Sequence, residues 1–260
     1  MPKKITNENE NENKKKQYET GHYKLLESLD RLIAAAQTLD QDRLDPPEDL
    51  TINALQMRQT AANLLQNAIG NARADWRTVA LVRAKDIEKF APLAVEAVAA
   101  LESRGASAET IEDARTYVRK LHGKRAKPKA KDDPATPELD ESEKGISASQ
   151  QSAAAQLATM NELIDFLDAQ PEYANVKKAK LLVPAMRAFV NGTQTNHTGS
   201  ITAAASLTTA RNERNKDFYL DEDNICDLAK RYKALVKGEY GANSPEYKMI
   251  NEINFIKIKS

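Results

Sequence analysis

The sequence predicts an all-α protein made of two diverged tandem four-helix bundles, with up-and-down antiparallel helices, joined by a flexible linker. Three observations lead to this prediction. Helix-forming residues dominate, whereas aromatic residues make up only 5% of the 260 residues. Apolar residues recur at helical spacing along most of the chain. The order of these helical segments in the first half of the chain is repeated in the second half.

Changes in composition predict where the parts of the chain begin and end. Residues 1–20 alternate Asn and Glu and contain a lysine cluster, which predicts a disordered N-terminus. Residues 21–122 form the first predicted bundle and residues 151–260 the second. The charged, proline-containing stretch 123–150 has no apolar periodicity and is typical of a linker.

The first predicted helix has an apolar stripe along one face, and the loop after it contains a helix-start signal. Asp45 is a plausible N-cap, Pro46 fits the first helical position, and Glu48 completes the capping-box spacing. The apolar residues of the stripe are Leu25, Leu29, Leu32, Ala36 and Leu39.

Three further helices complete the first repeat. We expect a long helix over residues 48–82 and a separate one over 85–103, with a kink or a later start at Pro92. Gly105 fits the left-handed position that follows a helix, and Ser107 then caps a fourth helix.

The second repeat matches the first by pattern. Gly105 and Ala106 correspond to Gly241 and Ala242. After this joint, Ser244 is the predicted N-cap and Pro245 the first helical residue. Glycines and β-branched residues in 191–199 predict a break in the long second helix of this repeat. In the first helices, Leu29, Leu32, Ala36 and Leu39 match Leu157, Met160, Ile164 and Leu167.

Charge and targeting signals limit the classes of partner and compartment. The formal net charge is zero, so no overall field attracts nucleic acid or anionic lipid. The N-terminus has no apolar secretory region, and no run approaches the roughly 18 apolar residues that span a membrane. A single cysteine, Cys226, excludes an internal disulfide. We expect a cytoplasmic protein that does not bind membranes.

The search for catalytic, cofactor and metal motifs is negative, so we expect no enzyme, cofactor or metal site. His22, His122 and His197 are scattered and are interpreted as solvent-exposed. The stretch Asp221–Asn224 fails as a calcium loop because Ile225 and Cys226 occupy the fifth and sixth positions. It is interpreted as a loop and helix start, and Cys226 as a small buried hydrophobe.

Two arginine pairs occupy matching places in the repeats. Arg73 and Arg77 in the first correspond to Arg211 and Arg214 in the second. They could form a paired anion or partner site. The favoured interpretation is that their stems lie along helix interfaces, with the charged heads outside or ion-paired. Trp76 has no aromatic counterpart and is predicted to pack in a core or between domains.

A basic segment, residues 119–131, offers an alternative site for nucleic acid or another polyanion. It lacks the aromatic residues that stack single-stranded bases, and the acidic block 132–143 would compete for its cations. A solvated linker is the favoured interpretation. Its candidate phosphate-binding residues are Lys124, Arg125, Lys127, Lys129 and Lys131.

The C-terminal joint carries a family resemblance. Gly241, Ser244, Pro245, Glu246 and Tyr247, together with the earlier stretch ARNERNKDFY, resemble a set of uncharacterised bacterial proteins. Those proteins are tandem helical repeats with a Gly-x-x-Ser-Pro-x-Tyr-type joint. The resemblance implies the duplication and supplies no activity.

The function favoured by the sequence is a non-enzymatic helical interaction or scaffold protein, self-associating or bivalent. Its partner would be a protein or a second copy of the chain. Nucleic-acid binding through residues 119–131 is the alternative. A carboxylate-based metal or enzyme site inside a bundle is the least favoured, because no Glu-x-x-His motif is present.

Overall fold

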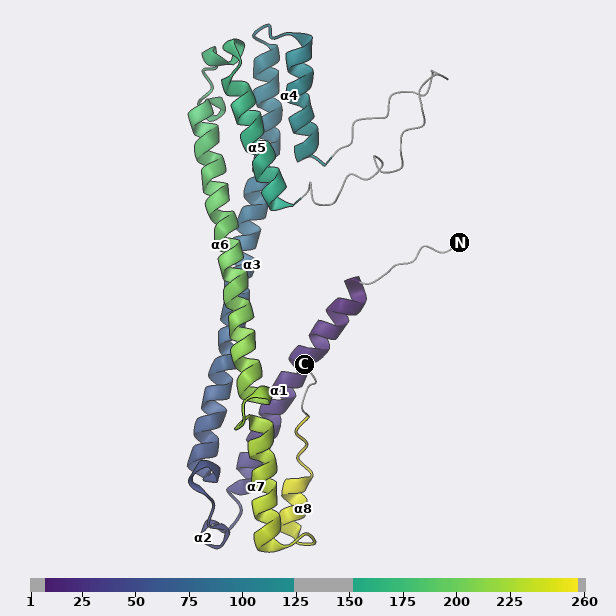
Figure 1. Ribbon diagram of the computed structural model, residues 1–260, viewed down its shortest axis with the longest axis vertical. Coiled ribbons are helices and arrows are strands. Elements are labelled where there is room, and N and C mark those ends of the chain that lie inside the picture. The colour runs from purple at the N-terminus through teal and green to yellow at the C-terminus, as the bar shows by residue number, and fades with distance from the viewer. Residues whose placement is uncertain (1–7, 124–151, 257–260) are drawn as a thin grey trace, which may run out of the picture. The chain divides into compact units, whose positions relative to one another are not determined.

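The computed structural model describes residues 8–123 and 152–256, with side chains from Gly21 onward. Every regular element in these ranges is a helix, which confirms the all-α prediction (Figure 1). Of the predicted N-terminal segment, residues 1–7 lie outside the described residues, and the first helix begins at Glu8. The predicted linker lies outside the described residues except for Gly123.

The described ranges contain α-helices and a few shorter helical turns. In chain order the α-helices are α1 (Glu8–Ala36), α2 (Gln41–Leu44), α3 (Ile52–Glu102), α4 (Ala108–Leu121), α5 (Ala153–Asp168), α6 (Val183–Asn215), α7 (Ile225–Tyr240) and α8 (Pro245–Asn251). The shorter elements are the 3₁₀ turns η1 (Glu48–Leu50), η4 (Pro171–Asn175) and η5 (Ala179–Leu181), and the π-helical turn η6 (Lys216–Leu220).

The chain forms two compact units that cross the predicted repeat boundaries. Unit 1 comprises residues 1–72 and 206–260, and unit 2 comprises residues 73–205. Helices α3 and α6 each contribute one part to unit 1 and the other part to unit 2. Each unit therefore contains helices from both predicted repeats.

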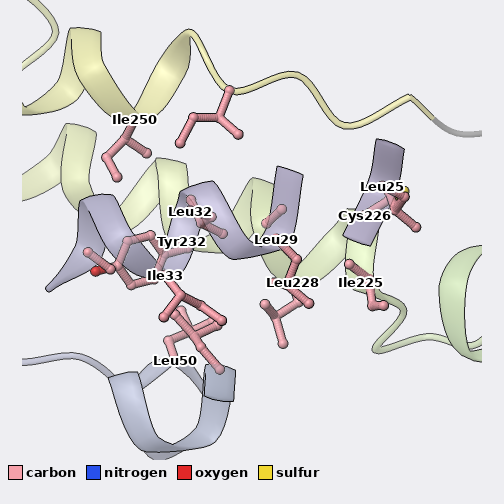
Figure 2. Packing of buried hydrophobic residues seen from close by; sticks show 14 of the residues in the cluster. Leu25, Leu29, Leu32, Ile33, Leu50, Ile225, Cys226, Leu228, Tyr232 and Ile250 are labelled. Carbon is pink, nitrogen blue, oxygen red and sulfur yellow. The ribbon is translucent and has the colours of Figure 1, made fainter. Parts of the chain in front are cut away.

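The core of unit 1 is built around the predicted apolar stripe of α1. Leu29 and Leu32 of α1 pack with Tyr232 of α7, Ile250 of α8 and Leu50 of η1 (Figure 2). Because α1 buries this face against α7 and α8, removal of their apolar side chains from water stabilises all three helices. All five residues of the predicted stripe are buried: Leu25, Leu29, Leu32, Ala36 and Leu39.

The core of unit 2 is formed by the last part of α3, by α4 and α5, and by the first part of α6. Phe90 and Leu101 of α3 join Ala114 of α4, Leu163 of α5 and Met186 of α6 in one buried cluster. Helix α4 lies beside α5 (Figure 1). The matched residues of α5 predicted from the repeat are also buried: Leu157, Met160, Ile164 and Leu167.

The predicted boundary between helices 48–82 and 85–103 is wrong, because α3 runs without interruption from Ile52 to Glu102. The intervening residues, Arg83 and Ala84, are good helix formers and include no turn residue. The helix also continues through Pro92. Proline removes one backbone donor, and the burial of Phe90 and Ala94 on either side of Pro92 offsets that loss.

The predicted break at 191–199 is also wrong, because α6 is continuous through this stretch. Backbone carbonyls of the preceding turn accept hydrogen bonds from two threonine hydroxyls, so these side chains are satisfied within the helix. Thr193 Oγ1 donates to the carbonyl of Phe189 at 3.0 Å, and Thr195 Oγ1 donates to that of Asn191, also at 3.0 Å. Gly199 lies against Val79 of α3, where an added Cβ would meet Val79 at 3.4 Å. Neighbouring side chains outweigh the weak intrinsic propensity.

Most helix-end predictions are confirmed. Ser107 and Ser244 accept backbone N–H bonds at the starts of α4 and α8, and Gly105 and Gly241 have φ of 85° and 89°. Asp45 differs from its predicted role: it ends α2 in the left-handed conformation, with φ of 42°. The short helix α2 places this aspartate after a helix instead of before one.

Among the described residues, no helix combines the length and apolar character that a membrane span requires.

Candidate functional site

A group of buried and half-buried polar side chains lies in unit 1, where α6 ends and α7 begins. We call it the junction cluster. Its members come from α1, α3, the end of α6, the η6 turn and the N-cap of α7: His22, Arg58, Gln66, Arg214, Asp217, Tyr219 and Asn224.

The backbone at this junction turns through a π-helical segment. The N–H of Asp221 donates to the carbonyl of Lys216 at 3.0 Å, which closes the wider turn of η6. Asn224 then caps α7, accepting from the N–H of Asp227 at 3.1 Å and donating to the carbonyl of Asp221 at 2.7 Å. The prediction that Asp221–Asn224 form a loop and helix start is confirmed. Single π turns are frequent at functional sites.

Arg58 of α3 ties this turn together. Its Nη2 lies 2.8 Å from Asp217 Oδ1 and also donates to the carbonyls of Asp217 and Asp223, at 3.3 and 3.0 Å. Arg58 Nε and Asp217 Oδ2 are buried and have no hydrogen-bond partner among the described residues. Burial raises the pKa of Asp217, and the positive charge of Arg58 opposes that rise.

A second arginine lies deeper in the cluster. Arg214 is buried, and its Nη1 donates to Gln66 Oε1 of α3 at 3.4 Å. Its Nε and Nη2 donate to Asn215 Oδ1 at 3.2 and 3.0 Å. These bonds to neutral amide oxygens satisfy guanidinium donors that burial has removed from water.

His22 and Tyr219 form the third part of the cluster. His22 Nδ1 and Tyr219 Oη are 2.8 Å apart, and the two rings are inclined with centroids 5.5 Å apart. Burial raises the pKa of the Tyr219 hydroxyl, which keeps it neutral. The predicted exposure of His22 is therefore wrong. Its place three residues before Leu25, on the buried stripe of α1, is the signal that could have indicated burial.

The side chains of the junction cluster are arranged to hold other parts of the same chain in position. Its charged groups hold backbone carbonyls, amides and one carboxylate of the chain itself. In the described parts of the chain, no group of three or more His, Cys, Asp or Glu side chains could hold a metal ion. Cys226 is buried beside the cluster, as predicted.

The four predicted arginines fall in different units. Arg73 and Arg77 belong to unit 2, whereas Arg211 and Arg214 belong to unit 1. Arg77 is exposed, Arg73 and Arg211 are half-buried, and Arg214 is buried. Arg73 and its match Arg211 are therefore similarly exposed, whereas Arg77 and its match Arg214 occupy unlike environments. Their role in anion or partner binding stays a prediction.

Other predicted residues are placed as follows. Trp76 is 37% exposed and belongs to neither core cluster, so the predicted packing in a core is wrong, and packing between domains stays a prediction. His122 is exposed and His197 half-buried. The candidate phosphate-binding residues lie outside the described residues: Lys124, Arg125, Lys127, Lys129 and Lys131.

Helix α3 carries an exposed apolar stripe in unit 1 that the sequence analysis missed. Met57 and Leu64 are 67% and 64% exposed, and Ala61 and Ala68 on the same helix face are also exposed. These four residues, which we call the α3 stripe, follow the spacing of one helical face. The buried residues of α3, such as Leu55 and Ala62, lie on the other side. In the sequence, the α3 stripe has the same spacing as a buried helix face. Only its solvent exposure in the structure distinguishes it from one.

Comparison of the chain with protein-family models, with curated proteins and with solved structures gives no significant match. The bacterial resemblance of the C-terminal joint therefore stays a prediction.

Proposed function

We propose that this chain is a non-enzymatic helical interaction protein of the cytoplasm, and that the α3 stripe binds an amphipathic helix of a partner protein. The observation that carries the proposal is the exposure of Met57 and Leu64, two helical turns apart on one face. Apolar anchors at this spacing are how a helix recognises a second helix. Methionine also adapts its shape to a partner surface.

The surroundings of the stripe support a protein partner. Charged residues make up 29% of the whole chain, yet Arg58 is the one charged residue between Ile52 and Asn71. Arg58 is held inward by Asp217. An exposed helix face without charges is unusual for a solvated surface, whereas the centres of protein interfaces are depleted in charge.

The corresponding face of α6 differs, which favours one binding face over two. In α3 the buried residues Leu55 and Ala62 precede Met57 and Leu64 by two positions. In α6 the residues that match them in the register of Arg73 with Arg211 are the buried Thr193 and Ser200, followed two positions later by Thr195 and Thr202. Threonine offers little apolar area. We therefore favour a single partner helix over the bivalent form of the hypothesis.

We further propose that the chain is a diverged tandem repeat of a four-helix sequence, akin to the bacterial proteins with the Gly-x-x-Ser-Pro-x-Tyr joint, and that its two bundles form across the repeat boundary. Support comes from matched positions that are buried in both copies, including Leu32 with Met160 and Val98 with Val236. The two glycine joints with positive φ add to this support.

The test compares two charge-introducing double variants of the full chain. Met57→Lys with Leu64→Lys places two cations on the α3 stripe. The matched control, Thr60→Lys with Asn67→Lys, places two cations with the same spacing on an adjacent exposed face. Self-association of each purified chain is measured by sedimentation, and bound proteins are captured from source-cell lysate with and without nuclease.

We expect the affinity of the stripe variant for its partner to fall by at least about tenfold, because a charge in an apolar contact is left desolvated and unpaired. The control variant should bind as the native chain does. Equal binding by all three chains would refute the proposal. Self-association that is lost in the stripe variant would identify a second copy as the partner. Recovery of nucleic acid that falls steeply with salt would support the basic segment instead.

A further inference from the structure

The two halves of the chain share the core of unit 1. The first half supplies α1, η1 and the start of α3, with Leu29 and Leu55 among the buried residues. The second half supplies η6, α7 and α8, with Phe218, Tyr232 and Ile250. Figure 2 shows side chains from both halves in contact around Tyr232. Neither half contains enough of this core to bury its own apolar faces.

Unit 2 is shared in the same way. The first half supplies the end of α3 and all of α4, including Phe90 and Leu101. The second half supplies α5, η4, η5 and the start of α6, including Met160 and Leu163. The helices that begin the second half thus complete a unit with the helices that end the first half.

Polar contacts in unit 1 follow the same division. Arg231 Nη2 of α7 lies 2.5 Å from Asp49 Oδ2. Ser28 Oγ of α1 donates to the carbonyl of Asn254 at 2.8 Å. The guanidinium of Arg43 lies 4.3 Å from the centre of the Tyr240 ring. With the Arg58–Asp217 pair already described, these contacts join the first half of the chain to the second.

Unit 2 has equivalent ties between the halves. Glu96 of α3 accepts from Lys178 and Lys180 at 2.5 and 2.7 Å. Asn196 Nδ2 of α6 donates to Asp86 Oδ2 of α3 at 2.8 Å. The ion pairs are exposed and contribute little energy individually, but they fix which surfaces meet.

From this distribution we propose that residues 8–123 and 152–256 are obligate folding partners. Each half presents a surface that fits the other half of this chain, and each supplies part of both units. The two predicted repeats are then not independent domains: the first helices of one repeat fold with the last helices of the other. This inference concerns the chain's internal assembly and does not depend on the proposed function.

Hydrogen exchange in the full-length chain separates this arrangement from two self-contained repeats. Tyr232→Ala opens a cavity in α7. Protection of amides in α1, between Leu25 and Ala36, is expected to fall about tenfold or more, and that in α5 to change less. Met160→Ala in α5 is the matched variant. It should reduce protection in α4 and leave α1 less affected.

The opposite pattern would overturn the proposal. If Tyr232→Ala reduced the protection of α5 as much as that of α1 or more, α7 would be folding with its own repeat. The two variants also control for general loss of stability, because each is expected to affect a different unit.

A second measurement uses the native core and so avoids variants that fail to fold. A recognition site for a specific protease is placed between Gly123 and Ser152, and the folded chain is cut there. We expect the two pieces to elute together at the size of the uncut chain, at about micromolar concentration, with the helical signal unchanged. Separation of the pieces under native conditions would overturn the proposal.

Discussion

At the scale of single residues, Arg58 shows how one side chain can organise a turn. Its Nη2 reaches one carboxylate and two backbone carbonyls of the η6 turn and the loop after it. A partly buried carboxylate such as Asp217 costs stability unless a cation lies beside it. The junction cluster therefore depends on Arg58 more than its modest burial suggests.

Replacing Arg58 tests this dependence. Arg58→Met keeps the aliphatic stem but leaves Asp217 without its cation, so we expect a loss of about 2–3 kcal/mol in the free energy of unfolding, measured with urea. Arg77→Met, at an exposed position of the same helix, should cost less than about 0.5 kcal/mol. Equal losses for the two variants would contradict the assigned role.

Asp217 predicts a pH effect of defined sign. Because its pKa is raised in the folded chain, the folded state binds the proton more tightly than the unfolded state does. Proton binding by Asp217 therefore stabilises the fold fully below the pKa of Asp217 in the unfolded state. This stabilisation is lost as the pH rises through the pKa of Asp217 in the folded state. Asp217→Asn does not titrate, so the stability of this variant relative to the native chain should increase over that interval. Urea midpoints across the acidic range provide the measurement, and a decrease would contradict it.

At the scale of elements, the stripes and caps could be predicted from the sequence, whereas the lengths of α3 and α6 could not. Local residues set the caps at Ser107 and Ser244, so local patterns are sufficient there. Helix continuity through Pro92 and through 191–199 depends on packing against distant helices. The junction cluster was missed for the same reason, since Arg58 and Asp217 meet only after folding.

Replacing two glycines of the chain by alanine is expected to change its stability in opposite directions. Gly105 follows α3 with φ of 85°, where a side chain is strained, so Gly105→Ala should lower the free energy of unfolding by about 1 kcal/mol. Gly70 lies inside α3 with open space around an added Cβ. Gly70→Ala should raise stability by about 0.5–1 kcal/mol, because alanine favours the helix. Thermal or urea unfolding measures both changes, and a shared sign would contradict the assignment.

At the scale of the whole molecule, the two apolar clusters have no buried residue in common. Sequence patterns located the stripe of α1 and its counterpart in α5 but could not assign them to units. Periodicity identifies a buried face without identifying the helix that covers it. The repeat pattern suggested that neighbours in sequence would fold together, and the structure instead combines α1 with α7 and α8.

Separate cores predict additive changes in stability. Ile33→Val in unit 1 and Ile164→Val in unit 2 should each cost about 0.5–1.5 kcal/mol. The double variant should lose the sum of the two within about 0.5 kcal/mol, because the sites share no neighbours. Equilibrium unfolding of the four chains measures the coupling. A larger coupling would mean that the clusters respond to each other.

The sharing of each unit by both halves has a consequence for ancestry. Two separate copies of one ancestral half-length chain could assemble both units as a homodimer, each unit taking its leading helices from one copy and its trailing helices from the other. Gene duplication and fusion would then convert an obligate dimer into a monomer without a new fold. After fusion, the two halves of the chain no longer need to have the same sequence, so equivalent places in the two units can differ. One would then be free to acquire the Arg58–Asp217 junction and the other the Asp86–Asn196 contact.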